Sequence, residues 1–182
     1  MAKIYWAGKS CFQISVSTSR DHSADITINP LKEDNADVLL LTNKENKIKT
    51  TKGESFIVEG PGEYEVKEVF IQGISSSQNT IYVFEAEDIR FCHLGDLGQR
   101  ELTDEQVEKI GQIDILMIFA GDDSQKIIGQ IEPKIVIPMD YENVSKFLKT
   151  MGKPSIAPVD KLVVKDSTMP KEGAMEIVVL QP

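Results

Sequence analysis

The sequence predicts an α+β protein in which two mixed β-sheets pack face to face with helices outside. Three observations lead to this fold class. The first half of the chain is rich in short apolar segments with strand-like character. The stretch after residue 100 alternates helical and strand-like segments, and the chain closes with further strands. Such an order suits two packed sheets, although the pattern alone also allows other α+β folds.

Eight segments of the first half are predicted strands because they are apolar, rich in β-branched and aromatic residues, and bounded by turn residues. They are residues 4–7, 11–17, 24–28, 38–42, 56–59, 69–73, 80–85 and 89–93. Gln13 to Ser17 alternates clearly, so one face of that strand should be buried and the other solvated. Gly60-Pro61-Gly62 predicts a turn between two short strands.

The second half contains three predicted helices. Thr103 can cap a helix that runs to Ile110, with Gln106 closing a capping box. Residues 124–131 and 142–150 form the other two helices, the last with an apolar face. The predicted strands of this half are 113–119, 134–138, 161–165 and 175–180. We expect residues 1–182 to form one domain.

Composition limits the partners and the cellular location that we expect for this protein. The formal net charge of −9 opposes binding to nucleic acid or to an anionic membrane. No apolar run approaches the ~20 residues that span a bilayer, and the N-terminus has no signal-peptide pattern. We therefore expect a cytoplasmic protein. Cys11 and Cys92 lie in apolar strand contexts and are expected to be reduced core residues.

The segment from Cys92 to Gly98 places Asp96 in a turn that directly follows a predicted buried strand. Functional residues of layered α/β proteins often occupy this position. Three further segments accompany it in the chain: Gly8 to Phe12, Val58 to Tyr64, and Ile137 to Tyr141. In this order they resemble the small, lactonase-like metallo-β-lactamase-fold hydrolases. The resemblance covers nearly the whole chain and implies an αβ/βα four-layer sandwich.

Hydrolases of that family bind one or two zinc ions through imidazoles and carboxylates. Their motif Thr-His-x-His-x-Asp-His corresponds to the segment that begins at Thr42. Asn43 then stands at the first histidine, Glu45 at the second, Lys47 at the aspartate and Ile48 at the last histidine. Two of these residues cannot bind zinc, and the lysine ammonium would repel it. By resemblance, the metal motif is degenerate.

Two further motifs of the family also lack their histidine in this chain. Asp140 stands at the histidine of the family's Pro-Met-His-Tyr, and Lys9 at the histidine of its Gly-His-Ser, a position that usually lies just outside the metal ligands. Only Asp96, which resembles the bridging carboxylate, is matched. The chain holds only two histidines, His22 and His93, so a three-histidine zinc site is excluded by counting. We expect no zinc and no other cofactor.

Two residues are catalytic candidates, Asp96 and His93, the latter as an acid or base. A structural role for His93 at its strand end is the favoured alternative. We also predict that Lys9, with Lys44 or Lys47, neutralises Asp96 and Asp140 in a metal-free cluster, because carboxylates left without zinc would repel one another. Cys92 and His93 are no catalytic pair, because adjacent strand residues point to opposite faces.

The sequence thus favours a hydrolase-like protein that lacks zinc-dependent hydrolysis, a pseudoenzyme acting by binding or assembly. Its partner is an unknown small molecule or protein, and a homo-oligomer stays open. The alternative is an active hydrolase of an ester, lactone or phosphoester that uses Asp96, Asp140 and Glu45 around one hard cation, Mg²⁺ or Mn²⁺. A third interpretation is an interaction module, for example half of a complex with an intact paralogue.

Overall fold

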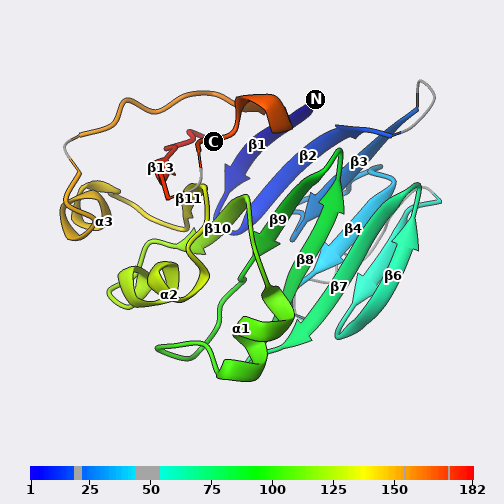
Figure 1. The fold of residues 1–182 in the computed structure, drawn as a ribbon. Helices are drawn as coiled ribbons and strands as arrows, with labels where there is room; N and C mark the ends of the chain where they lie inside the picture. Colours follow the sequence, from blue (N-terminus) through cyan, green and yellow to red (C-terminus); the bar gives the residue numbers. More distant parts are fainter. Residues whose placement is uncertain (19–21, 44–53, 154, 172) are drawn as a thin grey trace.

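Two β-sheets packed face to face form the body of the molecule (Figure 1). The computed structural model describes residues 1–18, 22–43, 54–153, 155–171 and 173–182. One sheet has six strands and the other seven, and both mix parallel and antiparallel neighbours. The predicted fold class is confirmed.

The six-stranded sheet has the order β12-β1-β2-β3-β4-β5. Its first neighbours are antiparallel, and β3, β4 and β5 run parallel. The strands are β1 (Ala2–Gly8), β2 (Cys11–Ser17), β3 (Ser23–Ile28), β4 (Val38–Leu41), β5 (Phe56–Glu59) and β12 (Leu162–Val164). The long antiparallel ribbon of β1, β2 and β3 alternates buried and exposed side chains, as the sequence predicts for Gln13 to Ser17.

The seven-stranded sheet has the order β13-β11-β10-β9-β8-β7-β6. The successive strands β6, β7, β8 and β9 pair antiparallel, and the successive strands β9, β10, β11 and β13 pair parallel. The strands are β6 (Gly62–Val66), β7 (Val69–Ser75), β8 (Thr80–Ala86), β9 (Ile89–His93), β10 (Ile115–Phe119), β11 (Ile135–Met139) and β13 (Glu176–Ile177). The parallel half is buried on both faces, as parallel sheets require.

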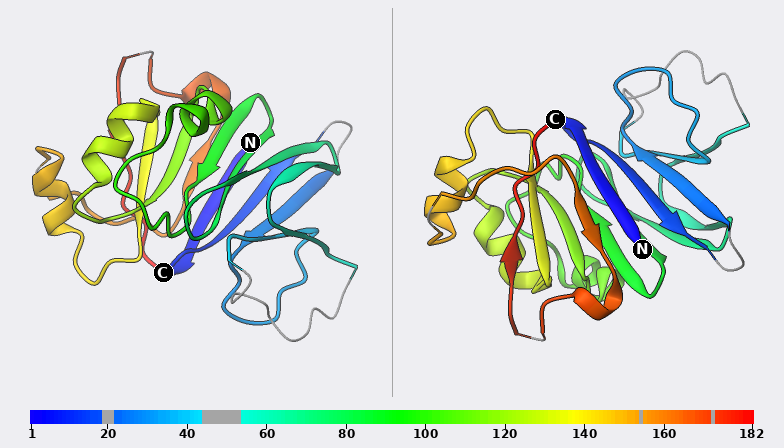
Figure 2. Two further views of the ribbon diagram at one scale, coloured as in Figure 1. Left: turned by 90° about the horizontal axis from the view of Figure 1, so that it is seen from below. Right: turned by 90° about the horizontal axis from the view of Figure 1, so that it is seen from above.

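The three α-helices of the described chain lie on the side of the seven-stranded sheet (Figure 2). They are α1 (Asp104–Ile110), α2 (Ser124–Ile131) and α3 (Ser145–Thr150), and a 3₁₀ turn, η2 (Asp166–Thr168), follows β12. Thr103 caps α1 and forms the predicted capping box with Gln106. None of the helices in this part of the chain is long and apolar enough to cross a membrane.

The main core fills the space between the sheets, where Phe84 stacks on Phe91 at a centroid distance of 4.8 Å. Tyr82 extends from β8 across this core to the six-stranded sheet. Its hydroxyl accepts a hydrogen bond from the Gly60 N–H at 3.0 Å and lies 2.9 Å from the Leu41 carbonyl and 3.1 Å from the Val58 carbonyl. Burial raises the pKa of Tyr82 to about 12. The hydroxyl therefore joins one sheet to the ends of β4 and β5 in the other.

Candidate functional site

One end of the sandwich gathers those positions singled out by the sequence that the structure describes. The β1–β2 turn, the end of β4, the β7–β8 loop and the segments after β9 and β11 meet there. Their contacts are main-chain hydrogen bonds: Thr80 N–H to the Thr42 carbonyl at 2.8 Å, and Asp140 N–H to the Lys9 carbonyl at 3.2 Å. Polar side chains fill the space between these segments.

Asn29 holds β4 to the β1–β2 turn. The residue is 3% exposed and has a positive φ of 46° directly after β3. Its side-chain amide donates to the Ser10 hydroxyl at 3.0 Å and the Thr42 hydroxyl at 2.9 Å, and its Oδ1 accepts from the Thr42 N–H at 2.9 Å. The left-handed backbone, which asparagine tolerates better than most residues, turns the amide into this position.

His93 is fully buried at the end of β9. Its Nε2 lies 3.0 Å from the Ser10 carbonyl oxygen, and its Nδ1 accepts from the Gly95 N–H at 3.1 Å. Because a carbonyl only accepts, these partners assign the ring proton to Nε2. Burial lowers the pKa of His93 to about 4, against the opposing effect of the hydrogen bond to Ser10. With both nitrogens occupied, the geometry favours the structural interpretation over a catalytic one.

Gly95 allows the β9 segment to pass tightly beside the β7–β8 loop. Its φ is +60°, and a Cβ at this position would lie 1.9 Å from Asn79 Nδ2 and 3.0 Å from the Thr42 Cβ. The Asn79 amide donates to the Leu94 carbonyl at 2.9 Å. We call Ser10, Asn29, Thr42, Asn79 and His93 the strand-end network. Every member is an uncharged group in this arrangement, with His93 neutral at physiological pH.

The predicted site carboxylates lie outside this network. Asp96 and Asp140 are both exposed, as are Lys9 and Asn43. No ion pair joins Lys9 to Asp96 or Asp140, so the prediction that Lys9 neutralises these carboxylates is wrong. The exposed lysine is solvated instead, and only its backbone carbonyl binds the Asp140 segment. The other predicted positions, Lys44, Glu45, Lys47 and Ile48, lie outside the described residues.

Two cavities open at this end. The first, of ≈ 290 Å³, lies between the segment after β9 and the start of α2, and Asp96 and Phe119 are among its lining residues. The second, of ≈ 380 Å³, lies between the end of β4 and the β7–β8 loop, and is lined mainly by hydroxyl and amide residues such as Ser76 and Asn79. The segment that lines the first cavity is tied to the loop that lines the second, because the Ser77 hydroxyl donates to the Leu97 carbonyl at 2.7 Å.

Comparison with known proteins identifies the family. The model of the beta-lactamase superfamily domain matches residues 3–140, which run from β1 to the residue after β11 and leave out β12 and β13. The chain belongs to this superfamily. No match was found among curated proteins.

Solved structures of superfamily members have the same fold. A protein from Thermotoga maritima, provisionally assigned as a Zn-dependent hydrolase of the metallo-beta-lactamase superfamily, is 29% identical. It aligns with a TM-score of 0.82 over 99% of both chains. A metallo hydrolase from Ignicoccus hospitalis is 14% identical, with a TM-score of 0.66 over 100% of this chain and 95% of its own. A metallo-beta-lactamase fold protein from Bacillus subtilis is 9% identical, with a TM-score of 0.55 over 98% and 96%.

A zinc site needs several imidazole, thiolate or carboxylate groups gathered around one point. In the described parts of the chain no three His, Cys, Asp or Glu side chains lie together in a group that could hold a metal ion. Neither nitrogen of His93 has a free lone pair for a metal, because Nε2 carries the proton and Nδ1 accepts from Gly95. The residues described therefore do not fit a zinc ion.

Sequence reasoning missed Asn29, Asn79 and the side chain of Thr42. A signal was present for one of them, because Asn29-Pro30 is a dipeptide that marks a turn after a strand. Nothing in the sequence pairs Asn29 with Thr42 or Asn79 with Leu94, since those contacts depend on which strands become neighbours.

Proposed function

We propose that this superfamily member no longer carries out zinc-dependent hydrolysis and acts by binding a small molecule or a protein. The observation that carries the proposal is the strand-end network. It leaves the buried His93 ring with no free lone pair, and no three His, Cys, Asp or Glu side chains of the described residues lie together. A metal ion that used His93 would have to break its hydrogen bonds and leave buried groups unpaired, which is unfavourable.

The cavities beside the network are the binding region that we propose. Their lining combines apolar side chains at the ends of β9 and β10 with polar groups of the β7–β8 loop. Ligand sites of open α/β sheets commonly lie at the carboxyl ends of parallel strands. The net charge of −9 argues against nucleic acid as the partner.

Metal content of the purified, untagged protein tests the proposal. Elemental analysis should find almost no zinc, manganese or iron, and addition of Zn²⁺, Mn²⁺ or Mg²⁺ should leave the melting temperature unchanged. About one metal ion per chain, or a saturable rise in melting temperature, would overturn it. The variant Glu108→Gln is the control for metal ions that bind loosely to surface carboxylates, because it removes an exposed carboxylate of α1 on the helical side of the molecule.

The alternative is an active hydrolase around one hard cation. Two observations favour it: Asp96 and Asp140 are exposed carboxylates at the ends of β9 and β11, and the Thermotoga maritima protein carries a hydrolase assignment. Hydrolysis of aryl ester, lactone and phosphodiester substrates with added Mn²⁺ tests it. Activity that survives Glu108→Gln and is lost in Asp96→Asn would establish this function in place of the first.

A further inference from the structure

The six-stranded sheet ends in two open edges, β12 and β5. Within the described residues, β12 pairs only with β1, and β5 only with β4. The open side of an edge strand presents main-chain N–H and C=O groups that can bind a strand of another molecule. Val163 on β12 and Ile57 on β5 are each 42% exposed. Both edges therefore combine open main-chain groups with an exposed apolar side chain.

The hydrogen bonds between β4 and β5 show which residues of β5 face the open edge. Phe56 N–H donates to the Asp37 carbonyl at 2.8 Å, so Phe56 directs its main-chain groups to β4. Successive strand residues direct these groups to opposite sides. Ile57 and Glu59 therefore direct theirs away from β4, to the open edge.

The same alternation identifies the open residue of β12. Thr18 N–H donates to the His22 carbonyl at 2.8 Å, so the residues of β2 in phase with Thr18 face β3. Ser15, in the other phase, faces β1, where it pairs with Lys3. Lys3 thus directs its main-chain groups to β2, and its partner on the other side, Val163, directs its own away from β1.

The exposed apolar side chains of the two edges lie on the same face of the sheet. Val58 and Val164 belong to the core between the sheets. Because successive strand residues face opposite sides, their neighbours Ile57 and Val163 point to the outer face. A strand from a second copy can therefore keep its apolar core side inward when it continues this sheet.

The two edges carry opposite charges. Lys161 and Lys165 flank the exposed valine of β12, and Lys3 lies beside it on β1. No carboxylate of the described residues forms an ion pair with any of these three lysines. Glu54 and Glu59 are exposed carboxylates before and at the end of β5. The β12 edge is therefore basic and the β5 edge acidic.

Local contacts hold Lys161 on the outer face. Its Nζ lies 5.9 Å from the centroid of the Tyr5 ring, and this contact leaves its positive charge in place. The neighbouring Asp160 is in the opposite phase of the strand and accepts a hydrogen bond from the Gln181 amide. Asp166, which follows Lys165, begins the 3₁₀ turn η2.

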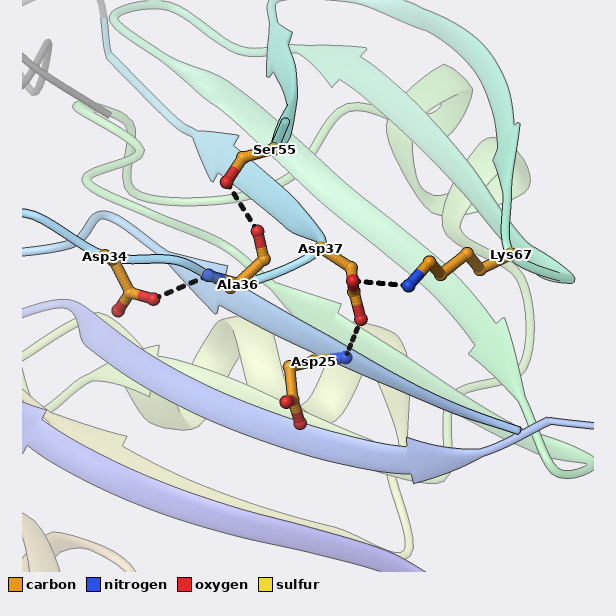
Figure 3. Close-up of polar contacts among 6 residues, drawn as sticks. All are labelled: Asp25, Asp34, Ala36, Asp37, Ser55 and Lys67. Atoms are coloured by element: carbon orange, nitrogen blue, oxygen red, sulfur yellow. Dashed lines mark hydrogen bonds and ion pairs between the residues drawn. The ribbon is translucent and has the colours of Figure 1, made fainter. Parts of the chain in front are cut away.

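Side-chain contacts fix the start of β5 (Figure 3). The Ser55 hydroxyl donates to the Ala36 carbonyl at 2.6 Å. Asp37, just before β4, binds the Lys67 ammonium and accepts from the Asp25 N–H at 3.0 Å. Lys67 is a cation near this edge, but its charge is matched by Asp37 and does not offset the carboxylates of β5.

We propose that β12 of one copy of this chain pairs with β5 of another, so that the six-stranded sheet continues from molecule to molecule. A second copy in the same orientation brings β12 antiparallel to β5, as the strand directions within the sheet require. With Val163 opposite Ile57, Lys161 lies opposite Glu59. This register joins the open main-chain groups of both edges and places opposite charges in one cross-strand pair.

Pairing of like edges is less favourable. Two β12 strands centred on Val163 would place Lys161 opposite Lys165, and two β5 strands would bring their glutamates together. The head-to-tail contact leaves one edge of each kind free, so the assembly grows beyond a dimer. One short strand pair is a small interface, and the association is therefore weak.

Sedimentation equilibrium of the full chain at low salt tests the proposal. The mean mass should rise with concentration beyond that of a dimer, and it should fall at high salt because the charges are screened. The mass of a monomer at every concentration up to about 1 mM, or an end point at the mass of a dimer, would overturn the proposal.

Charge exchange identifies the two edges. Lys161→Glu and Glu59→Lys should each weaken the association several-fold, because like charges then meet. An equimolar mixture of the two variants should associate again, since each possible contact between them joins opposite charges. Glu108→Lys makes the same change in net charge on α1 and should leave the association unchanged. A mixture that stays monomeric, or an equal loss in Glu108→Lys, would refute the contact.

A proline in β12 tests the main-chain pairing. Val163→Pro removes an N–H that faces the open edge and should abolish association while the ladder with β1 remains. Leu162→Pro is the matched variant, because it removes an N–H that faces β1 and should destabilise the fold instead. Circular dichroism distinguishes the two effects. Association that persists in folded Val163→Pro would show that β12 is not the contact.

Discussion

Lys9 and Asp140 meet through their backbones rather than their charges. The Asp140 N–H donates to the Lys9 carbonyl at 3.2 Å, and Trp6 Nε1 donates to the same carbonyl at 2.7 Å. Both residues have left-handed backbones, with φ values of 50° and 51°. Such conformations are strained for residues other than glycine and persist where surrounding contacts impose them. The Lys9 carbonyl therefore holds the β1–β2 turn, and the Lys9 ammonium takes no part in this contact.

Two substitutions of Lys9 distinguish the effect of its backbone conformation from the effect of its charge. Lys9→Met should change the free energy of unfolding by less than about 0.5 kcal/mol, as is usual for exposed positions. Lys9→Gly should stabilise the fold by up to about 1 kcal/mol, because glycine adopts positive φ without strain. Urea denaturation measures both. Lys67→Met, which removes the partner of Asp37, is the comparison, and an equal loss in Lys9→Met would mean that Lys9 has an ionic partner after all.

Asn29→Ala should destabilise the protein by about 2–3 kcal/mol, because it leaves the buried N–H of Thr42 and the half-buried hydroxyl of Ser10 without this partner. Chemical denaturation followed by tryptophan fluorescence provides the measurement. Asn35→Ala removes an exposed asparagine from the next loop and should have little effect. Similar losses in the two variants would contradict a special role for Asn29.

Gly95→Ala should be far more harmful than Gly152→Ala. The two glycines have similar φ values of +60° and +65°, but a Cβ at Gly152 meets nothing within 4 Å, whereas at Gly95 it collides with Asn79. We expect losses of about 1 kcal/mol at Gly152 from backbone strain and about 3 kcal/mol or more at Gly95. The double variant Gly95→Ala, Asn79→Ala should recover part of the difference. Equal melting temperatures for the two single variants would disprove the tight approach.

His93 should make stability fall as the pH decreases from about 6.5 to about 4. In this range the unfolded chain takes up a proton on this histidine, while the buried ring, with its pKa of about 4, stays neutral. The slope from His93 is at most about 1.4 kcal/mol per pH unit, and it disappears below the folded pKa. His93→Gln should lose this component and His22→Gln should keep it. An NMR titration in which the His93 ring titrates near pH 6.5 would show that it is not buried as described.

Local sequence signals predicted most elements because the forces that form them are local. β2, β5, β9 and α2 have the predicted boundaries. The last helix begins at Ser145 rather than residue 142, because Asn143 Oδ1 accepts the Ser145 N–H and holds a turn before it. The predicted strand 175–180 pairs with β11 only over Glu176–Ile177, since Leu180 forms a bridge with Val159 instead.

The sequence predicted the end of the sandwich at which Asp96 and Asp140 lie, but not the hydrogen bonds there. Strand order placed Asp96 and Asp140 near one end of the sandwich, as expected from their locations after β9 and β11. The sequence could not reveal that Asn29 fills the space between Ser10 and Thr42, because hydrogen bonds between distant segments depend on the assembled sheets. Lys9 forms no ion pair with these carboxylates because an exposed ammonium gains little from one and readily stays in water, whereas Lys44 and Lys47 lie outside the described residues.

The Tyr82 hydroxyl couples the two layers of the molecule mechanically. It is attached to β8 yet bonded to the Gly60 amide and to carbonyls at the ends of β4 and β5, so neither sheet can slide along the other without breaking these bonds. Edge strands normally exchange their amide protons quickly. The Gly60 amide, although it lies beside an edge strand, should exchange only when the layers part, and so it reports the opening of the whole sandwich.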